Sequence, residues 1–198
     1  MIYETLQILK EQLENYFSEV GLGKILELEN IALWESGSEN ANNVKNKVAM
    51  TLLNLEEETS LKNLPHVNIK NEQVEYSNPP VNLNLYLLIS ANCNTYEKSL
   101  RSISKTIEFF QGKSVFTSSN TVYNRTNVAF DVLDYFKFHL QLFTPTFEQL
   151  NNIWGTLGGR QLPSVIYKIK LIQIKQTKKL ASAGVITHVG GDLNEISQ

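Results

Sequence analysis

Residues 78–92 read NPPVNLNLYLLISAN, and this stretch is predicted to decide the fold. Side chains alternate between the two faces of a β-strand, so the odd-numbered residues 81–89 form one continuous apolar face. The opposite face begins with Asn82 and Asn84 and becomes apolar at Tyr86 and Leu88. We therefore expect a central strand that runs from a solvated end into a part of the sheet that is covered on both sides.

The paired prolines before this strand mark where it begins. Pro79 and Pro80 have no backbone N–H to donate, so they cannot lie in the middle of a hydrogen-bonded ladder. From Val81 onward, eleven residues at about 3.3 Å each span roughly 36 Å, which is long for a globular strand. A strand of that length predicts a sizeable sheet on either side of it.

Length and composition indicate a folded protein with one main domain. The chain has 198 residues, of which 42% are hydrophobic and 19% are charged, and no linker rich in proline, glycine or serine divides it. The net charge of -2 argues against a strongly basic nucleic-acid binder, and no apolar run is long enough to predict a membrane span. We expect one domain over residues 1–175 and an extension over residues 176–198.

The N-terminus and the cysteine content predict synthesis in the cytoplasm. The first residues, MIYETLQILKEQ, carry acids early and lack a long apolar run, so we expect no signal peptide. Cys93 is the single cysteine, so it cannot form an intrachain disulfide. A chain with one cysteine suits a reducing compartment.

Hydrophobic periodicity predicts an α+β domain. The expected order is helix, two strands, central strand, helix, strand, helix, strand, which suits a mixed, mostly antiparallel sheet with flanking helices. Helices are expected over residues 2–20, 96–110 and 147–157, and strands over residues 24–34, 48–55, 81–91, 136–142 and 163–174. A polar loop is expected over residues 35–46, and one short strand is possible at residues 73–76.

Local signals add detail to these elements. Residues 146–149 fit a capping box, and the apolar phase slips after Leu171, which predicts a bulge or a change of partner in the last strand. On the second helix, the apolar face that we expect to cover the central strand consists of Tyr96, Leu100, Ile103, Ile107 and Phe110. On the third helix, the expected apolar face consists of Phe147, Leu150, Trp154 and Leu157.

Charge is distributed unevenly along the chain. Residues 1–60 hold eleven glutamates and four lysines, whereas residues 149–191 hold six basic residues and no acid. Such a chain could bind copies of itself, acidic region to basic region, or the two regions could neutralise each other within one fold. The candidate interface residues are Glu56, Glu57 and Glu58 on the acidic side and Arg160, Lys175, Lys178 and Lys179 on the basic side.

The tail contains a β-prone segment between glycines, residues 184–191. Such a segment outside a finished domain is what strand addition to a partner sheet would use, and we hypothesise that residues 183–191 add to a neighbour. The alternative is a strand that pairs back on its own domain. The tail residues that we name as candidate interface residues are Val185, Ile186, Thr187 and Val189.

Residues that could carry chemistry are scarce. The three histidines, His66, His139 and His188, fall in separate elements, and none has a partner at metal-ligand spacing, so we expect no metal. The sequence has no phosphate loop, no Gly-x-Ser-x-Gly elbow and no base near Cys93. We therefore expect no catalytic residues and no cofactor, which favours a binding or structural role over an enzyme.

A second hypothesis from another class is a small α+β enzyme or ligand-binding protein. In that case Asn82, Asn84 and Tyr86 would form the floor of a pocket. A deep pocket that converges on these three side chains, with a titratable group beside it, would favour this hypothesis.

Five parts of the sequence, in register, together resemble a known family. They are residues 54–58 with 61–63, residues 79–91, Tyr96 and Leu100 with residues 110–111, residues 148–150 with 153–154, and residues 163–167. Together they resemble the N-terminal domain of the tail-terminator or cap proteins of extracellular contractile injection systems. Those systems include the Photorhabdus virulence cassette and the antifeeding prophage. The resemblance covers residues 2–174.

The resemblance implies a non-enzymatic α/β domain that closes into a six-membered ring, a hexamer, at the top of the inner tube. The ring would end tube growth and hold the last sheath layer, so the implied partners are the chain itself, sheath subunits and inner tube subunits. Neither nucleic acid nor a membrane is an expected partner. Assembly in the cytoplasm, followed by release in an extracellular particle, is expected. Some members carry a further extension beyond the position of Gln198. The resemblance therefore leaves open whether this chain is the outermost cap or an internal adaptor.

Overall fold

The structure is a computed structural model, and it describes residues 1–33, 39–58, 67–70, 73–76, 81–124, 136–174 and 181–184. The described helices are α1 (Ile2–Glu19), α2 (Glu39–Val44), α3 (Tyr96–Gly112) and α4 (Phe147–Thr156), with a 3-10 helix, η1, at Ile31–Leu33. The main sheet contains β1 (Leu26–Leu28), β2 (Lys47–Glu57), β5 (Val81–Asn92), β6 (Val115–Thr117), β7 (Lys137–Phe143) and β8 (Ser164–Ile174). A second sheet contains β3 (Val67–Lys70), β4 (Gln73–Tyr76) and β9 (Ala181–Gly184).

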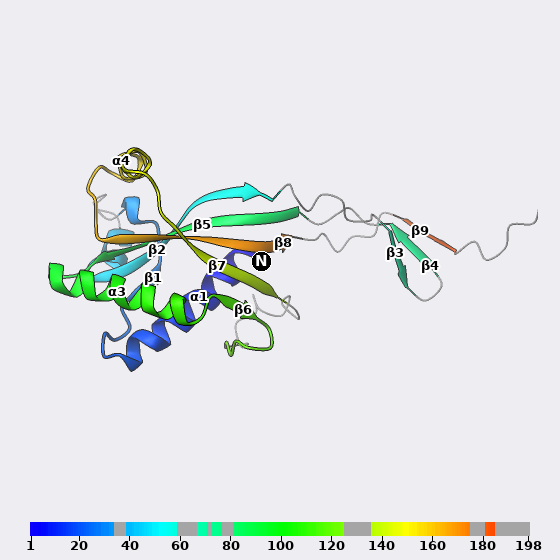
Figure 1. The fold of residues 1–198 in the computed structure, drawn as a ribbon, viewed down its shortest axis with the longest axis horizontal. Helices are drawn as coiled ribbons and strands as arrows, with labels where there is room; N and C mark the ends of the chain where they lie inside the picture. Colours follow the sequence, from blue (N-terminus) through cyan, green and yellow to red (C-terminus); the bar gives the residue numbers. More distant parts are fainter. Residues whose placement is uncertain are drawn as a thin grey trace, which may run out of the picture.

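The main sheet has the strand order β1-β2-β5-β8-β7-β6, and only the β1–β2 pair is parallel. The predicted α+β class with a mixed, mostly antiparallel sheet is therefore confirmed. β5 lies between β2 and β8, which confirms it as a central strand (Figure 1). The register shifts between Leu83 and Leu85 opposite β8, where Leu85 pairs with Ile169 and Leu83 with Ile172. This shift is the bulge that the change of apolar phase in the last strand predicts.

Helices cover both faces of the sheet at the centre of β5. On one face, the core holds Leu85, Leu87 and Ile89 together with buried side chains of α1 and α3. On the other face, Leu88 packs with Trp154 of α4 and with side chains from η1 and α2. Because consecutive residues of a strand point to opposite faces, adjacent leucines of β5 belong to two different cores.

The two asparagines near the start of β5 are buried, so the expectation that their face is solvated is wrong, although Val81 at the strand end is exposed. Asn82 is 3% exposed and Asn84 is 1% exposed. The side-chain Nδ2 of Asn84 donates a hydrogen bond of 3.0 Å to Oε2 of Glu58, at the end of the neighbouring strand. The amide nitrogen of Asn84 can be buried because the adjacent strand supplies its partner, and alternation of polar residues does not reveal that partner.

Several local predictions are confirmed and others are corrected. α1 ends before Gly21 and Gly23, which have φ of 79° and 76°, a conformation that favours glycine. The Thr146 capping box is present in full at the start of α4. The strand expected over residues 24–34 is only the three residues of β1 followed by η1, and part of the expected loop over residues 35–46 is α2.

The second sheet lies beyond the Val81 end of β5 and the Ile174 end of β8 (Figure 1). β4 pairs antiparallel with β3 and with β9, so residues 181–184 pair with a strand of their own chain. The short strand at residues 73–76 is confirmed, whereas β3 was not predicted from the sequence. Residues 185–191 lie outside the described residues, and strand addition by them stays a prediction.

One carboxylate connects α1 with the edge of the main sheet. Glu27 on β1 accepts a hydrogen bond of 2.7 Å from Nζ of Lys10 on α1 and another of 2.7 Å from Nζ of Lys47 on β2. Partial burial alone would raise the pKa of Glu27, but the two lysines outweigh that effect and lower it.

Replacing a leucine at the centre of the sheet should cost far more stability than replacing one near its polar end. Leu87 is fully buried and Leu55 is exposed, although both lie on long paired strands. Leu87→Ala is expected to lower the free energy of unfolding by about 3 kcal/mol because it leaves a cavity, whereas Leu55→Ala should lower it by less than about 1 kcal/mol. Urea denaturation followed by circular dichroism measures both values, and equal losses would contradict the central placement of β5.

Removing the charge of Glu27 should change stability in a pH-dependent way. Because the folded state lowers the pKa of Glu27, its contribution is present above the pKa of an unfolded glutamate, about 4.3, and is lost as the pH falls further. At pH 7, Glu27→Gln is expected to lose about 1 kcal/mol of unfolding free energy, and the difference from the unsubstituted chain should shrink toward zero as the pH falls below about 4. Denaturation curves from pH 3 to 7 test this, and a difference that does not depend on pH would refute the ion-pair explanation.

Candidate partner-binding surfaces

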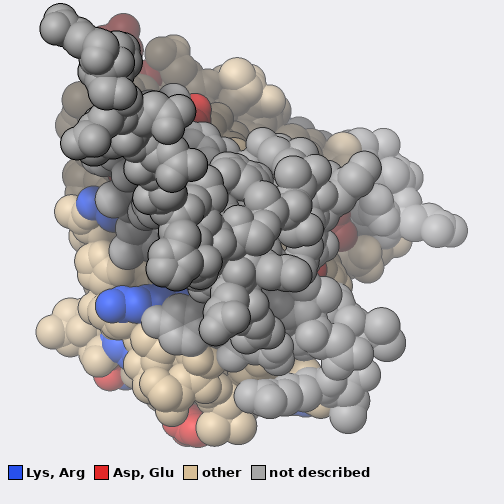
Figure 2. All heavy atoms as spheres, turned by 90° about the vertical axis from the view of Figure 1, so that its right-hand side faces the viewer, with Lys and Arg blue, Asp and Glu red and all other residues tan. Residues whose placement is uncertain are grey.

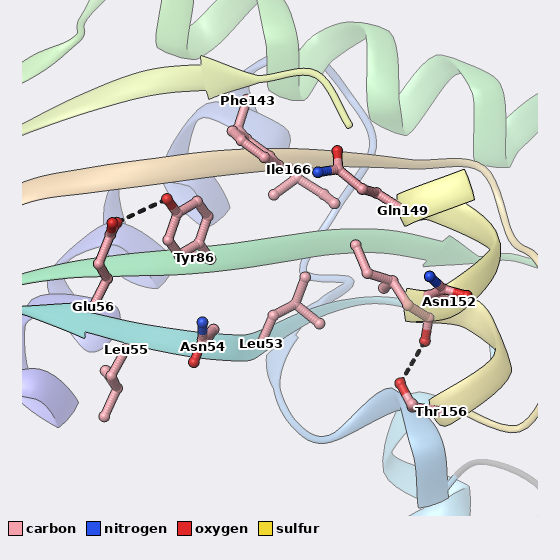
Figure 3. A pocket seen from close by; sticks show the side chains of 11 residues that line it. Leu53, Asn54, Leu55, Glu56, Tyr86, Phe143, Gln149, Asn152, Thr156 and Ile166 are labelled. Atoms are coloured by element: carbon pink, nitrogen blue, oxygen red, sulfur yellow. Dashed lines mark hydrogen bonds between the residues drawn. The ribbon is translucent and has the colours of Figure 1, made fainter. Parts of the chain in front are cut away.

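The acidic end of β2 is paired with a lysine of the same chain. Nζ of Lys168 on β8 donates a hydrogen bond of 2.6 Å to Oε2 of Glu56, and the hydroxyl of Tyr86 on β5 donates one of 2.8 Å to the same oxygen. The ammonium group of Lys168 also lies 5.1 Å from the centre of the Tyr86 ring. Figure 3 shows the hydrogen bond between Tyr86 and Glu56 across adjacent strands. Within this chain, an acid of the first third is therefore neutralised by a base of the last third.

Both charges of this pair are stabilised. Hydrogen bonds from Lys168 and then from Tyr86 lower the pKa of Glu56, and the hydrogen bond to Glu56 raises the pKa of Lys168. Glu56 thus stays ionised near neutral pH, whereas a general acid or base works best with a pKa near the working pH. The pair is exposed enough for water to screen it, so its contribution to stability is small.

A cavity of about 530 Å³ lies between this network and α4 (Figure 3). Tyr86 and Glu56 line it together with apolar side chains of the sheet and the polar side chains Gln149 and Asn152 of α4. Asn82 and Asn84 do not line it. Of the three residues that the second hypothesis assigned to one pocket floor, only Tyr86 therefore lines this cavity.

The remaining predicted interface residues fall into two groups. Glu57 is exposed and Glu58 is half-buried, both beside Glu56 at the end of β2, and Arg160 is exposed between α4 and β8. The other predicted residues, Lys175, Lys178, Lys179, Val185, Ile186, Thr187 and Val189, lie outside the described residues. Figure 2, which views the molecule from the side of the second sheet, shows acidic and basic side chains on the same face.

Only part of the apolar stripe predicted for α3 covers the sheet, because Phe110 and Ile103 pack against the core and the other three residues do not. Three small polar residues and Phe110 are the buried residues of this helix, and the three are Ser99, Ser102 and Thr106. Their hydroxyl groups donate hydrogen bonds to backbone carbonyls one turn earlier, such as the 2.8 Å bond from Ser102 to Lys98, so they can be buried without loss. The helix is consequently rotated, and Tyr96, Leu100 and Ile107 are exposed.

These exposed residues belong to an apolar groove of about 930 Å³ between α3, the end of β7 and the start of α4. No residue that lines this apolar groove carries a charge. Tyr96 is 70% exposed, Leu142 of β7 is 51% exposed, and Phe147 of α4 is 93% exposed, which corrects the prediction that Phe147 lies on a core face. An extended apolar surface of this kind is typical of a protein–protein contact.

An open strand edge borders the apolar groove. β6 pairs with β7 only at residues 137–139, and among the described residues no strand lies on that side of residues 141–143. Leu142 and Phe143, which pair with β8 on their inner side only, both line the apolar groove. An unpaired edge offers backbone N–H and C=O groups to an additional strand.

Sequence reasoning missed the apolar groove because it assigned its residues to the core. The signal that could have found it was the second face of α3, where Ser99, Ser102 and Thr106 recur at helical spacing. Small side chains allow a helix to approach a sheet closely. The face of α3 with the Ser and Thr residues can therefore pack against the core in place of part of the apolar stripe.

Among the described residues, no group of three or more histidine, cysteine, aspartate or glutamate side chains is arranged to hold a metal ion. In the same part of the chain, no helix has the length and hydropathy that a membrane span requires. Cys93 is a half-buried free thiol, and its Sγ lies 3.9 Å from Oγ of Ser102.

Residues 4–188 match the family model of the Pvc16 N-terminal domain. The chain belongs to this family. The match includes both sheets and the apolar groove, so the Pvc16 N-terminal domain family spans every element described above. No curated protein matches the chain by sequence.

Two solved structures share the fold of this Pvc16 N-terminal domain. One is the sheath/tube terminator, in the extended state, of an extracellular contractile injection system called PVC, with a TM-score of 0.66 and 14% identity. The other is the tube terminating cap of the anti-feeding prophage, with a TM-score of 0.64 and 12% identity. The matches cover 100% and 96% of this chain, but only 64% and 61% of those two chains.

The apolar residues at the rim of the groove should be dispensable for folding. Phe147→Ser is expected to change the free energy of unfolding by no more than about 0.5 kcal/mol because the ring is exposed. On the same helix, Trp154→Ala should lower it by about 3 to 5 kcal/mol because Trp154 is buried against the sheet. Thermal and urea denaturation of the two variants measure the difference. A large loss for Phe147→Ser would show that its ring packs inside the fold.

Proposed function

We propose that this protein is a structural cap, or terminator, at the end of the tube and sheath of a contractile injection particle. It would stop growth of the tube and anchor the last layer of the sheath. The observation that carries the proposal is the likeness in fold, over nearly the whole chain, to a sheath/tube terminator and to a tube terminating cap. Membership of the Pvc16 N-terminal domain family supports the same role.

The proposed form is a ring of identical subunits, with six copies to match the implied hexamer. A closed ring requires two different surfaces on each copy, so that one copy contacts the next head to tail. The apolar groove supplies one surface that the fold itself does not use. The second surface would be formed by the candidate acidic and basic residues. Among these, Glu57 and Arg160 lie in the described part of the chain and are exposed.

The proposed partners are further copies of the chain, the terminal sheath subunits and the terminal inner tube subunits. We propose no contact with nucleic acid or membrane, since the net charge is only -2. Assembly would take place in the cytoplasm, and the finished particle would act outside the cell.

The role we propose is not enzymatic. The polar network of Glu56 with Tyr86 and Lys168 holds its carboxylate ionised and paired. That arrangement does not tune a group for proton transfer. The pocket hypothesis therefore gains no support from the residues that were expected to form it.

The proposal can be tested on growing tubes. Inner tube subunits would be polymerised with and without the protein, and lengths measured by electron microscopy. Elongation is expected to stop at amounts far below one copy per tube subunit, because only the tube end needs to be bound. The protein should appear at one end of each tube as a ring with sixfold symmetry.

A control variant separates specific capping from general interference. Val122→Glu changes a side chain that is 88% exposed and lies outside the apolar groove, so it should cap as well as the unsubstituted chain. Tubes whose lengths do not respond to the protein, and whose ends carry none of it, would refute the terminator role.

A further inference from the structure

We propose that the apolar groove accepts residues 185–189 from the tail of a second copy of this chain, as an added strand on the open edge of β7. The proposal rests on the ring proposed above and names the contact that closes it. The described structure supplies the acceptor, and the sequence supplies the segment that fits it.

The acceptor has the geometry of a slot for an extended chain. Leu142 and Phe143 of β7 form its floor, and residues 141–143, which pair with β8 on their inner side, leave backbone hydrogen-bonding groups available on the outer side. α3 packs on one face of the sheet and α4 on the other, so the two helices flank this edge from opposite faces. An extended segment can pair with the edge while its alternate side chains contact the two helices.

The rim of the slot is apolar on both sides. Tyr96 and Leu100 project from α3, and Phe147 projects from the start of α4, all three exposed in the single chain. The buried face of α3 is formed mainly by hydroxyl side chains that are already satisfied within the helix. The apolar side chains Tyr96, Leu100 and Ile107 of this helix are therefore left exposed for an incoming partner.

The chemistry of the groove selects one part of the tail. Because the groove holds no charged residue, a charged segment would lose its hydration there without gaining a partner. The tail has lysines at positions 175, 178 and 179 and acids at positions 192 and 195, but residues 180–191 carry no Lys, Arg, Asp or Glu. Within that stretch, Val185, Ile186 and Val189 are the large apolar side chains, in the β-prone sequence VITHV.

The distance along the sheet requires that the tail come from another copy. The groove contacts residues 164–166 at the start of β8, whereas β9, which the tail follows, lies beyond the other end of β8 (Figure 1). β8 itself has 11 residues and is about 36 Å long at about 3.3 Å per residue. Residues 185–189 span at most about 17 Å, so they cannot reach back from Gly184 to the groove of their own chain.

Such an exchange gives the head-to-tail contact that a ring needs. Each copy would donate its tail strand to one neighbour and accept a strand from the other, so every groove and every tail is used when the ring closes. Backbone hydrogen bonds to β7 would provide affinity, and the apolar side chains would fix the register. The same pairing would cover an edge that is otherwise open to unwanted strands.

Disulfide trapping in the full chain tests the contact directly. One chain would carry Leu142→Cys and another Ile186→Cys, both with Cys93→Ser to remove the native thiol. Side chains on paired strands lie about 5 Å apart, within reach of a disulfide. Mixing the two chains under mild oxidation is expected to give a covalent dimer of unlike chains. Both substitutions in one chain should give a ladder that ends at the closed ring.

Further variants test the register of the added strand and the specificity of its contact with the groove. Cysteines placed singly at Val185 and Val189 show which tail residue lies beside Leu142. Val122→Cys is the matched control, because Val122 is highly exposed but lies outside the groove, and it should not link to any tail cysteine. In the chain with native tail, Leu142→Glu with Phe147→Glu should weaken ring assembly by about tenfold or more, whereas Val122→Glu should not change it.

The outcomes distinguish this inference from the proposed function. If light scattering shows a ring but no tail cysteine links to Leu142→Cys, the tail contact is wrong and the ring remains. If Leu142→Cys links to a sheath subunit instead, the groove belongs to the sheath and the tail contact is likewise overturned. If the unsubstituted chain neither forms a ring nor caps tubes, the terminator role itself fails.

Discussion

Burial of both faces of β5 is the constraint on which the rest of the structure depends. Leu87 and Leu88 are neighbours in sequence, yet one belongs to the core with α1 and α3 and the other to the core with α4. A strand placed this way cannot lie at an edge, so β2 and β8 must flank it and their lengths must match it. The positions of α3 and α4 on opposite faces follow from the same requirement, and these two helices define the apolar groove.

The charge asymmetry of the sequence is partly resolved inside the fold. Glu56 and Lys168 come from the acidic and basic regions, and they meet because β5 places β2 and β8 within reach of each other. Exposed ion pairs of this kind add little stability, but they leave less charge for long-range attraction between copies. Several apolar side chains of the groove, in contrast, are not buried by the described part of the chain. This difference shifts the expected basis of assembly from charge toward burial of apolar surface.

α3 shows why a correct helix can still be given the wrong orientation. Its apolar stripe and its Ser/Thr stripe both fit helical spacing, and hydrophobicity alone favours the first as the core face. The second packs against the sheet because each hydroxyl group is satisfied by a carbonyl of its own helix, which removes most of the cost of burial. The exposed stripe then becomes a surface that a monomer does not need.

The sequence by itself determined the elements that local patterns control. The paired prolines, the alternation after Val81, the glycines after α1 and the capping box of α4 each act within a few residues, and the element boundaries predicted from them hold. The tertiary structure alone decided the burial of Asn82 and Asn84, the rotation of α3 and the exposure of Phe147. Those features depend on which distant segment lies opposite a side chain, and a pattern along one segment carries no information about its partner.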